Sequence, residues 1–208
     1  MKPNKNMLII GITGEAGAGK SVVLNYLKEN YPCEILVADT IGNEVKEPGG
    51  ICYQPVIDLL GEDILLPDKT MNRTLIAERI FKDEKLVDKM NEIIHPAVHD
   101  EIFRRIDVYS KDDKIKFVFI EAALLIEAGY VDDLDELWYI CATSENRRKR
   151  LKETRGYTDA RIDGIMKNQL TAEEFCKYAD RVIENTGTKE ELYHKIDCIM
   201  GEYKWQHL

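Results

Sequence analysis

The segment Gly14–Ser21, which reads GEAGAGKS, constrains the fold of this 208-residue chain more than any other feature. It has the pattern GxxxxGK(S/T) and follows an apolar run over residues 7–12 that is typical of a strand buried on both faces. After it, apolar residues recur at helical spacing over residues 22–27. A buried strand, a glycine-rich turn and a helix in this order predict an α/β domain with a phosphate-binding loop.

The residue types in this segment suit phosphate binding for separate physical reasons. Glycines let successive backbone N–H groups approach phosphate oxygens without a clash from Cβ. The helix that begins near Lys20 adds the positive end of its dipole. We expect the Lys20 ammonium to reach the β- and γ-phosphates of a nucleoside triphosphate, and the Ser21 hydroxyl to ligate Mg²⁺. The alternative is a glycine-rich turn that binds nothing.

The remaining apolar pattern predicts how the chain is organised around this loop. Further short apolar runs near 35–38, 116–120, 137–141 and 181–184 predict four more strands. Residues 40–112 instead have helical patterns, near 54–60, 74–82 and 84–109. We therefore predict a three-layer α/β fold with a five-stranded parallel sheet. Its core would be 1–39 and 113–208, with an inserted helical lobe at about 40–112.

Helix starts are predicted by capping residues. Thr171 and Thr188 each precede a glutamate by three residues, which is the capping-box pattern. Ser144 is expected to cap the charged helix that follows the fourth strand.

Composition limits the partners and the compartment. The chain has 29 basic and 38 acidic residues, a formal net charge of −9, so we expect neither nucleic-acid nor membrane binding. There is no run of 18 apolar residues, and the polar start over residues 1–7 does not resemble a signal peptide. Met7 is an alternative start to Met1. The five scattered cysteines form no CxxC pair, which favours a reducing cytoplasm.

Positive charge is concentrated in one short segment. Six of the nine residues 147–155 are Arg or Lys, and they fall within a predicted lid at about 144–172. Arginine binds phosphate through a planar fork and stays charged. The alternative is a solvated helix face whose charges pair with acidic neighbours.

Taken together, these motifs resemble the dephospho-coenzyme A kinases over nearly the whole chain. The resemblance also rests on Ala-Asp at 38–39, Asn-Arg at 72–73, Ile-His-Pro at 94–96, Leu-Leu-Ile-Glu at 124–127, Gln169, and Ala-Asp-x-Val-Ile-x-Asn-x-Gly at 179–187. It implies a fold like that of nucleoside monophosphate kinases. It also implies that ATP, with Mg²⁺, phosphorylates the ribose 3′-hydroxyl of dephospho-CoA, the last step of coenzyme A synthesis.

The resemblance assigns roles to residues of this chain. Asp39 would accept the proton of the attacking hydroxyl, and Ser21 and Glu121 would hold Mg²⁺. Lys20 with Arg147, Arg150 and Arg155 would supply the catalytic positive charges. The expected ATP contacts are Gly14, Glu15, Ala16, Gly17, Ala18, Gly19, Lys20, Ser21, Val22 and Asn185. The expected acceptor contacts are Thr13, Asp39, Arg73, His95 and Leu124.

Two of these residues have ordinary structural alternatives. Asp39 could cap the helix that follows the second strand. His95 could be a packed, hydrogen-bonded side chain of the helical lobe.

The chain also departs from the family pattern at several positions. Glu15-Ala16 stands where Gly-Ile is usual, Asn72 replaces Asp, and residues 121–123 are Glu-Ala-Ala instead of Asp-Val-Pro. No histidine follows Asp39 at positions 42–44. These departures leave two other functions open: a kinase for another small nucleoside or nucleotide acceptor, or a nucleotide-sensing protein that transfers nothing. We expect a monomer or a weak homo-oligomer.

Overall fold

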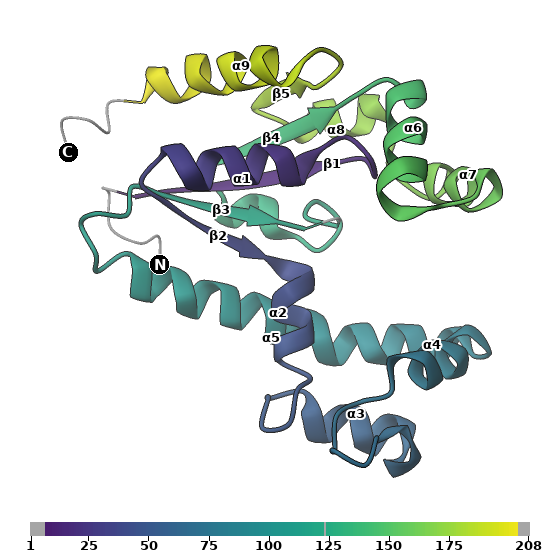
Figure 1. The fold of residues 1–208 in the computed structure, drawn as a ribbon. Coiled ribbons are helices and arrows are strands. Elements are labelled where there is room, and N and C mark those ends of the chain that lie inside the picture. Colours follow the sequence, from purple (N-terminus) through teal and green to yellow (C-terminus); the bar gives the residue numbers. More distant parts are fainter. Residues whose placement is uncertain (1–6, 123, 204–208) are drawn as a thin grey trace. The chain divides into compact units, whose positions relative to one another are not determined.

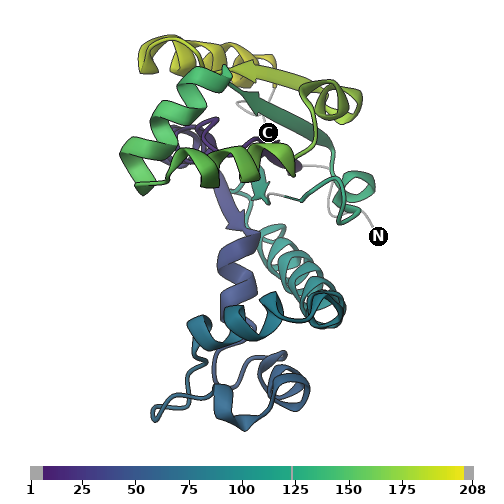
Figure 2. The ribbon, with the colours of Figure 1, turned by 90° about the vertical axis from the view of Figure 1, so that its right-hand side faces the viewer.

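The computed structural model describes residues 7–122 and 124–203, and Figures 1 and 2 show its ribbon from two sides. The expectations about the chain start and about Ala123 therefore lie outside the described residues. The chain divides into two compact units, one from the described parts of residues 1–36 and 109–208 and the other from residues 37–108. Within the described ranges, no helix is both long and apolar enough to cross a membrane.

The first unit is built on a parallel sheet, as the sequence predicts. Its strands are β1 (Leu8–Gly14), β2 (Cys33–Val37), β3 (Phe117–Glu121), β4 (Glu136–Cys141) and β5 (Arg181–Glu184). They lie in the order β2-β3-β1-β4-β5, so β1 is central and pairs with β3 and β4. The prediction of a five-stranded parallel sheet is confirmed.

Helices cover both faces of this sheet. The helices of this unit are α1 (Lys20–Asn30), η2 (Tyr130–Asp133), α6 (Ser144–Arg155), α7 (Asp159–Lys167), α8 (Ala172–Tyr178) and α9 (Lys189–Glu202), of which α6 and α7 lie beyond the ends of the strands (Figure 1). Alternate strand residues face opposite sides. Trp138 of β4 therefore joins the core cluster that includes residues of α1 and α9, whereas Tyr139 stacks on Phe175 of α8 with ring centroids 4.7 Å apart.

The helix caps follow from local sequence, with one exception. Thr171 with Glu174, and Thr188 with Glu191, both form complete capping boxes, so these two predictions are confirmed. Ser144 is not a cap. Thr143 caps α6 instead, with its hydroxyl accepting the Asn146 N–H at 3.2 Å, because Thr143 is the last residue before the backbone becomes helical.

The second unit is helical. It contains α2 (Ala38–Glu44), α3 (Tyr53–Leu60), η1 (Glu62–Ile64), α4 (Arg73–Phe81) and most of α5 (Glu84–Tyr109). The helical patterns predicted near 54–60, 74–82 and 84–109 coincide with α3, α4 and α5. The roles of acceptor lobe for about 40–112 and of lid for about 144–172 stay predictions.

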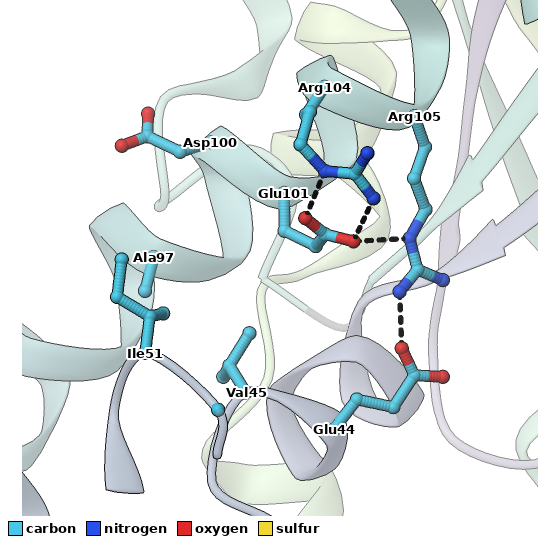
Figure 3. Close-up of a pocket in the computed structure, with 9 residues that line it drawn as sticks. Glu44, Val45, Ile51, Ala97, Asp100, Glu101, Arg104 and Arg105 are labelled. Atoms are coloured by element: carbon cyan, nitrogen blue, oxygen red, sulfur yellow. Dashed lines mark hydrogen bonds and ion pairs between the residues drawn. The ribbon is translucent and has the colours of Figure 1, made fainter. Parts of the chain in front are cut away.

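A pocket of about 340 Å³ lies where α2 meets α5 in the second unit (Figure 3). Charged side chains at its edge pair with one another: Arg105 bonds to Glu44 and Glu101, and Arg104 bonds to Glu101. The hydrogen bond from Arg104, together with Arg105, lowers the pKa of Glu101 to about 2. The Arg105–Glu44 pair therefore joins α2 to α5 at this pocket.

Candidate nucleotide-binding site

The loop between β1 and α1 has the backbone that phosphate binding requires. Gly17 and Gly19 have φ values of +81° and +100°, which glycine adopts without strain. A Cβ on Gly19 would lie 2.2 Å from Asn185 Nδ2, and one on Gly17 would lie 2.8 Å from the Arg147 carbonyl oxygen. Glycine is therefore required at both positions by conformation and by packing.

Lys20 joins the start of the loop to the end of a neighbouring strand. As the first residue of α1, it donates from Nζ to the Gly14 carbonyl at 2.7 Å. The same Nζ lies 3.6 Å from Oε1 of Glu121, the last residue of β3. Both side chains are largely buried, so a positive and a negative charge are held together at the mouth of the loop.

The outer side of the loop is held by donors from α6 and from the segment after β5. Arg147 Nε donates to the Ala16 carbonyl at 3.1 Å. The Ala18 carbonyl accepts from Arg150 Nη1 at 3.1 Å and from Asn185 Nδ2 at 2.8 Å. In a trans peptide the carbonyl and the next N–H point in opposite directions. Fixing these carbonyls therefore turns the N–H groups of Gly17 and Gly19 to the other side of the loop.

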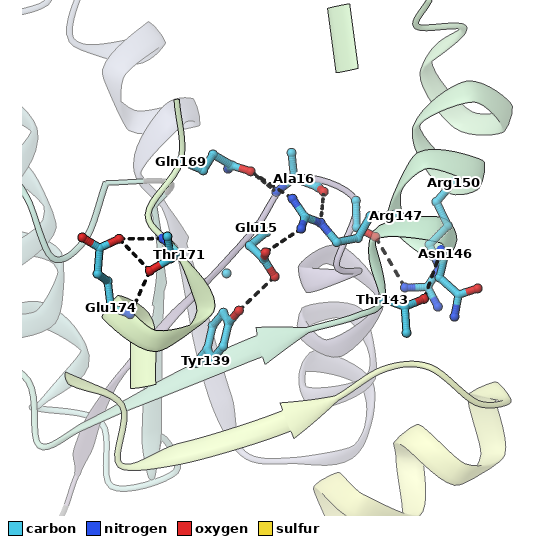
Figure 4. A network of polar contacts seen from close by, with 12 residues as sticks. Glu15, Ala16, Tyr139, Thr143, Asn146, Arg147, Arg150, Gln169, Thr171 and Glu174 are labelled. Carbon is cyan, nitrogen blue, oxygen red and sulfur yellow. Dashed lines mark hydrogen bonds and ion pairs between the residues drawn. The ribbon is translucent and has the colours of Figure 1, made fainter. Parts of the chain in front are cut away.

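A second set of contacts supports the first half of the loop (Figure 4). Glu15 accepts from Arg147 Nη1 at 2.5 Å and from the Tyr139 hydroxyl at 2.9 Å. Gln169 Oε1 accepts the Ala16 N–H at 3.0 Å. Burial, together with the hydrogen bond to Glu15, raises the pKa of Tyr139, so its hydroxyl stays a donor at neutral pH.

In the first unit, the structure brings several predicted residues together at the loop: Lys20, Glu121, Arg147, Arg150 and Asn185. Three other predicted residues of this unit have different surroundings. Arg155 is the last residue of α6 and is exposed, and its guanidinium lies 5.9 Å from the centre of the Tyr157 ring. Leu124 is half exposed. The buried Thr13 hydroxyl has no hydrogen-bond partner among the described residues.

The basic segment of α6 divides into two groups. Arg147 and Arg150 contact the loop, as described above. Arg148 instead pairs with Asp159 and Asp163 of α7, and Lys152 pairs with Asp159. The solvated-face alternative therefore describes Arg148 and Lys152 but not Arg147, whose side chain is only 6% exposed.

The second unit holds the remaining predicted residues. Asp39 lies in the first turn of α2, which has Val37 as its N-cap residue and no side-chain cap, so the capping alternative for Asp39 is wrong. His95 is exposed on α5, which excludes the packed alternative. Arg73 is also exposed and is the first residue of α4, and its Nη2 lies 3.9 Å from Oε1 of Glu47. Asn72 caps α4 by accepting the Leu75 N–H at 3.1 Å, a task that Asp performs equally well.

Arg73 also lines a cavity of about 310 Å³ in this unit. Lys46 lines it too, and the apolar part of the wall includes Met71, Ile76, Ile80 and Met90. Burial and the positive charge of Arg73 lower the pKa of Lys46, while the negative charge of Asp39 acts in the opposite direction. Lys46 therefore interacts electrostatically with both Arg73 and Asp39.

Sequence reasoning did not assign three residues that the structure places in these sites. Tyr139 has the pattern of an ordinary strand aromatic, and Gln169 has no periodicity or charge to mark it. Lys46 is one of many lysines, and only its position in the cavity beside Arg73 distinguishes it. Only Gln169 had a signal in the sequence, because it is one of the residues on which the family resemblance rests, although no role was assigned to it.

The phosphate loop leaves the central strand of a parallel sheet, opens α1 with Lys20, and is held by arginines from α6. The fold and the site are therefore those of a P-loop kinase. Residues 8–191 match the model of the family described as dephospho-CoA kinase. The dephospho-CoA kinase of Dehalococcoides mccartyi is 36% identical over 196 residues, which are 94% of this chain and 98% of that protein.

The chain belongs to the dephospho-CoA kinase family. It is accordingly an enzyme that phosphorylates dephospho-CoA with ATP in coenzyme A biosynthesis. Among solved structures, TT1252 from Thermus thermophilus is similar with a TM-score of 0.80 at 25% identity, covering 96% of this chain and 100% of that one. Dephospho-CoA kinase from Campylobacter jejuni has a TM-score of 0.71 at 19% identity, covering 96% and 98%, and supports the fold.

Proposed function

We propose that ATP binds to the Gly14–Ser21 loop and that its γ-phosphate is transferred to the ribose 3′-hydroxyl of dephospho-CoA. The observation that carries this proposal is the loop itself, whose carbonyls at Ala16 and Ala18 are tied outward by Arg147, Arg150 and Asn185. That arrangement favours inward N–H groups, which stabilise an anion. Lys20 adds a charge where the β- and γ-phosphates would lie.

Asp39 is proposed as the general base. Its carboxylate has no capping task in α2, and it comes two residues after the last residue of β2. Ligands of open α/β sheets bind beyond the carboxyl ends of the strands, which favours a functional role there. Asp39 would accept the proton of the 3′-hydroxyl while the hydroxyl oxygen bonds to the γ-phosphorus of ATP. The bond between the γ-phosphorus and the β–γ bridging oxygen breaks at the same time, and ADP leaves.

The cavity lined by Lys46 and Arg73 is proposed to receive the acceptor. Two cations beside an apolar wall suit a molecule that carries both phosphate and an uncharged arm with methyl and methylene groups, as dephospho-CoA does. Lys46 and Arg73 belong to the same compact unit as the proposed base Asp39, which is consistent with this role. Thr13, His95 and Leu124 stay further candidates for acceptor contacts.

The charges around the transferred phosphate are proposed to come from α6 and from Mg²⁺. Arg155 would contact the triphosphate directly, whereas Arg150, whose fork donates to the Ala18 and Asn185 carbonyls, would add its positive charge from behind the loop. The oxygen donors of Ser21 and Glu121 fit Mg²⁺, which binds few protein ligands and completes its shell with phosphates and water. The described residues hold no cluster of three His, Cys, Asp or Glu side chains, and such a Mg²⁺ site needs none. When bound, the ion would neutralise developing negative charge.

Product analysis tests this function. The purified chain is incubated with ATP, Mg²⁺ and dephospho-CoA, and the products are separated by mass. We expect coenzyme A and ADP in equal amounts. Phosphorylation of other nucleosides or nucleotides in an acceptor panel, with dephospho-CoA left unchanged, would instead favour the kinase for a different acceptor. Binding of ATP without transfer to any acceptor would favour a nucleotide sensor.

A further inference from the structure

Glu15, in the second position of the phosphate loop, has a side chain that is only 12% exposed. A buried carboxylate is stable only when it is paired and hydrogen-bonded. Here one oxygen accepts from Arg147 and the other from Tyr139, so both are satisfied. The Glu15 carboxylate is thus held by a specific partner at each of its two oxygens.

Arg147 is committed to the loop through all three of its side-chain nitrogens. Nε donates to the Ala16 carbonyl at 3.1 Å, Nη1 to Glu15 at 2.5 Å, and Nη2 lies 3.4 Å from Gln169 Oε1. Its side chain is 6% exposed. An arginine that closes on a phosphate directs its fork of donors toward the ligand. The fork of Arg147 is directed toward the loop and toward the residues that support it.

These contacts act on one residue of the loop from both sides. The Ala16 N–H is held by Gln169 and the Ala16 carbonyl by Arg147. Because that carbonyl belongs to the same planar peptide as the Gly17 N–H, its direction sets the direction of the donor. The backbone of Arg147 also packs against Gly17, which leaves this peptide little freedom to rotate.

We propose that Glu15 and Arg147 form a positioning pair that holds the first half of the phosphate loop in its anion-binding conformation. Arg147 acts on the loop backbone and not on the γ-phosphate, and Glu15 acts through Arg147. This inference rests on the proposed binding of ATP to the loop, but not on the identity of the acceptor.

The two possible roles of Arg147 differ in how they affect ATP and ADP. A loop in the wrong conformation lowers the affinity for ATP and for ADP by the same factor, because both nucleotides place their β-phosphate in the loop. Loss of a contact to the γ-phosphate lowers the affinity for ATP alone. The ratio of the two affinities therefore separates positioning from direct phosphate binding.

The experiment uses the full chain and four variants: Glu15→Gln, Arg147→Gln, the double variant, and Arg148→Gln as the control. Arg148 lies on the same helix but pairs only with α7 in the contacts described above. Dissociation constants for ATP and for ADP are measured by calorimetry, and thermal unfolding verifies that each variant folds. We expect each single substitution to weaken the binding of both ATP and ADP about tenfold. The double variant should bind them no more weakly than the single variant with the lower affinity, and Arg148→Gln should bind them as the wild type does.

Three results would contradict the proposal. The first is that a substitution lowers the affinity for ATP but not for ADP. The second is that the effects of the two substitutions multiply in the double variant, and the third is that no substitution changes either affinity. Where a single variant does not fold, Tyr139→Phe replaces it, because it removes only the hydroxyl that supports Glu15. It should weaken ATP and ADP equally, and unchanged binding would count against the pair. A wild-type chain that binds ATP but does not phosphorylate dephospho-CoA contradicts the proposed acceptor and leaves this test intact.

Discussion

The ammonium of Lys20 lies 3.6 Å from the carboxylate of Glu121 while it donates to the Gly14 carbonyl at 2.7 Å. One side chain thus bridges the beginning of the phosphate loop and the end of the adjacent strand β3. Both side chains are about 15% exposed, so the pair is weakly screened by water. A triphosphate and its metal ion would enter a site in which both charges are already fixed.

Replacing Lys20 with methionine tests the charge. The aliphatic part of the side chain is retained, so the fold should persist. Loss of a preorganised cation beside the transferred phosphate should lower kcat by about 10²–10³-fold. Steady-state kinetics at saturating ATP and dephospho-CoA measure this. A variant with wild-type kcat would contradict the role of Lys20.

Asp39→Asn tests the proposed base. The amide has nearly the same shape but cannot accept a proton from the 3′-hydroxyl. We expect kcat to fall by about 10²–10⁴-fold, while the dissociation constant for ATP stays at the wild-type value. Single-turnover kinetics and equilibrium binding separate the two quantities. Unchanged turnover would remove Asp39 from the chemical step.

Substitutions in the cavity of the second unit test acceptor binding. Lys46→Met and Arg73→Met should each raise KM for dephospho-CoA about tenfold, because each removes a charged partner of the acceptor's phosphates. KM for ATP should not change. Lys89→Met, on the exposed face of α5, is the matched control. A rise in KM for ATP with KM for dephospho-CoA unaltered would place the acceptor elsewhere.

Gly19→Ala tests the shape of the loop. A Cβ there would meet Asn185 Nδ2 at 2.2 Å, at a backbone φ of +100°. Gly129→Ala has a similarly positive φ of +77° but nothing within 4 Å, so it isolates the backbone cost of about 1–2 kcal/mol. Urea unfolding should show a larger loss for Gly19→Ala, and only this variant should lose ATP affinity. Equal effects of the two substitutions on stability and binding would refute the packing argument.

The pKa of Glu101 makes a prediction about pH. Its folded value of about 2 lies below the ordinary value of 4.5, because Arg104 and then Arg105 bond to the carboxylate. The stabilisation is therefore complete above pH 4.5 and is lost as the pH falls toward 2. Glu101→Gln should lower the free energy of unfolding by about 1–2 kcal/mol at pH 7, a value that takes the partial exposure of the pair into account. Near pH 2 the substitution should have little effect on it.

Urea unfolding at several pH values measures this difference, with Asp88→Asn on the same helix as the control. Asp88 is exposed, and its substitution should have little effect at any pH. A cost of Glu101→Gln that is the same at pH 7 and at pH 2.5 would show that charge pairing is not its origin.

Much of the fold and part of the site follow from residues close together in the sequence. The GEAGAGKS segment predicts a strand, a glycine turn and a helix because its requirements are local, and the capping boxes at Thr171 and Thr188 span only three residues each. The apolar runs predict the five strands, since a strand buried on both faces needs continuous apolar residues. Even the local prediction fails where neighbours compete, as Thr143 takes the cap expected at Ser144.

The partners of the loop were decided by tertiary structure. Glu15 bonds to residues 124 and 132 positions away, and Ala16 to one 153 positions away. These contacts exist because β1 lies between β3 and β4, an order that hydrophobic pattern does not encode. The sequence alone determined that the chain has a phosphate loop and a cluster of arginines. Only the tertiary structure decided that Arg147 is directed toward the loop and Arg148 toward α7, because burial and long-range pairing depend on which elements become neighbours.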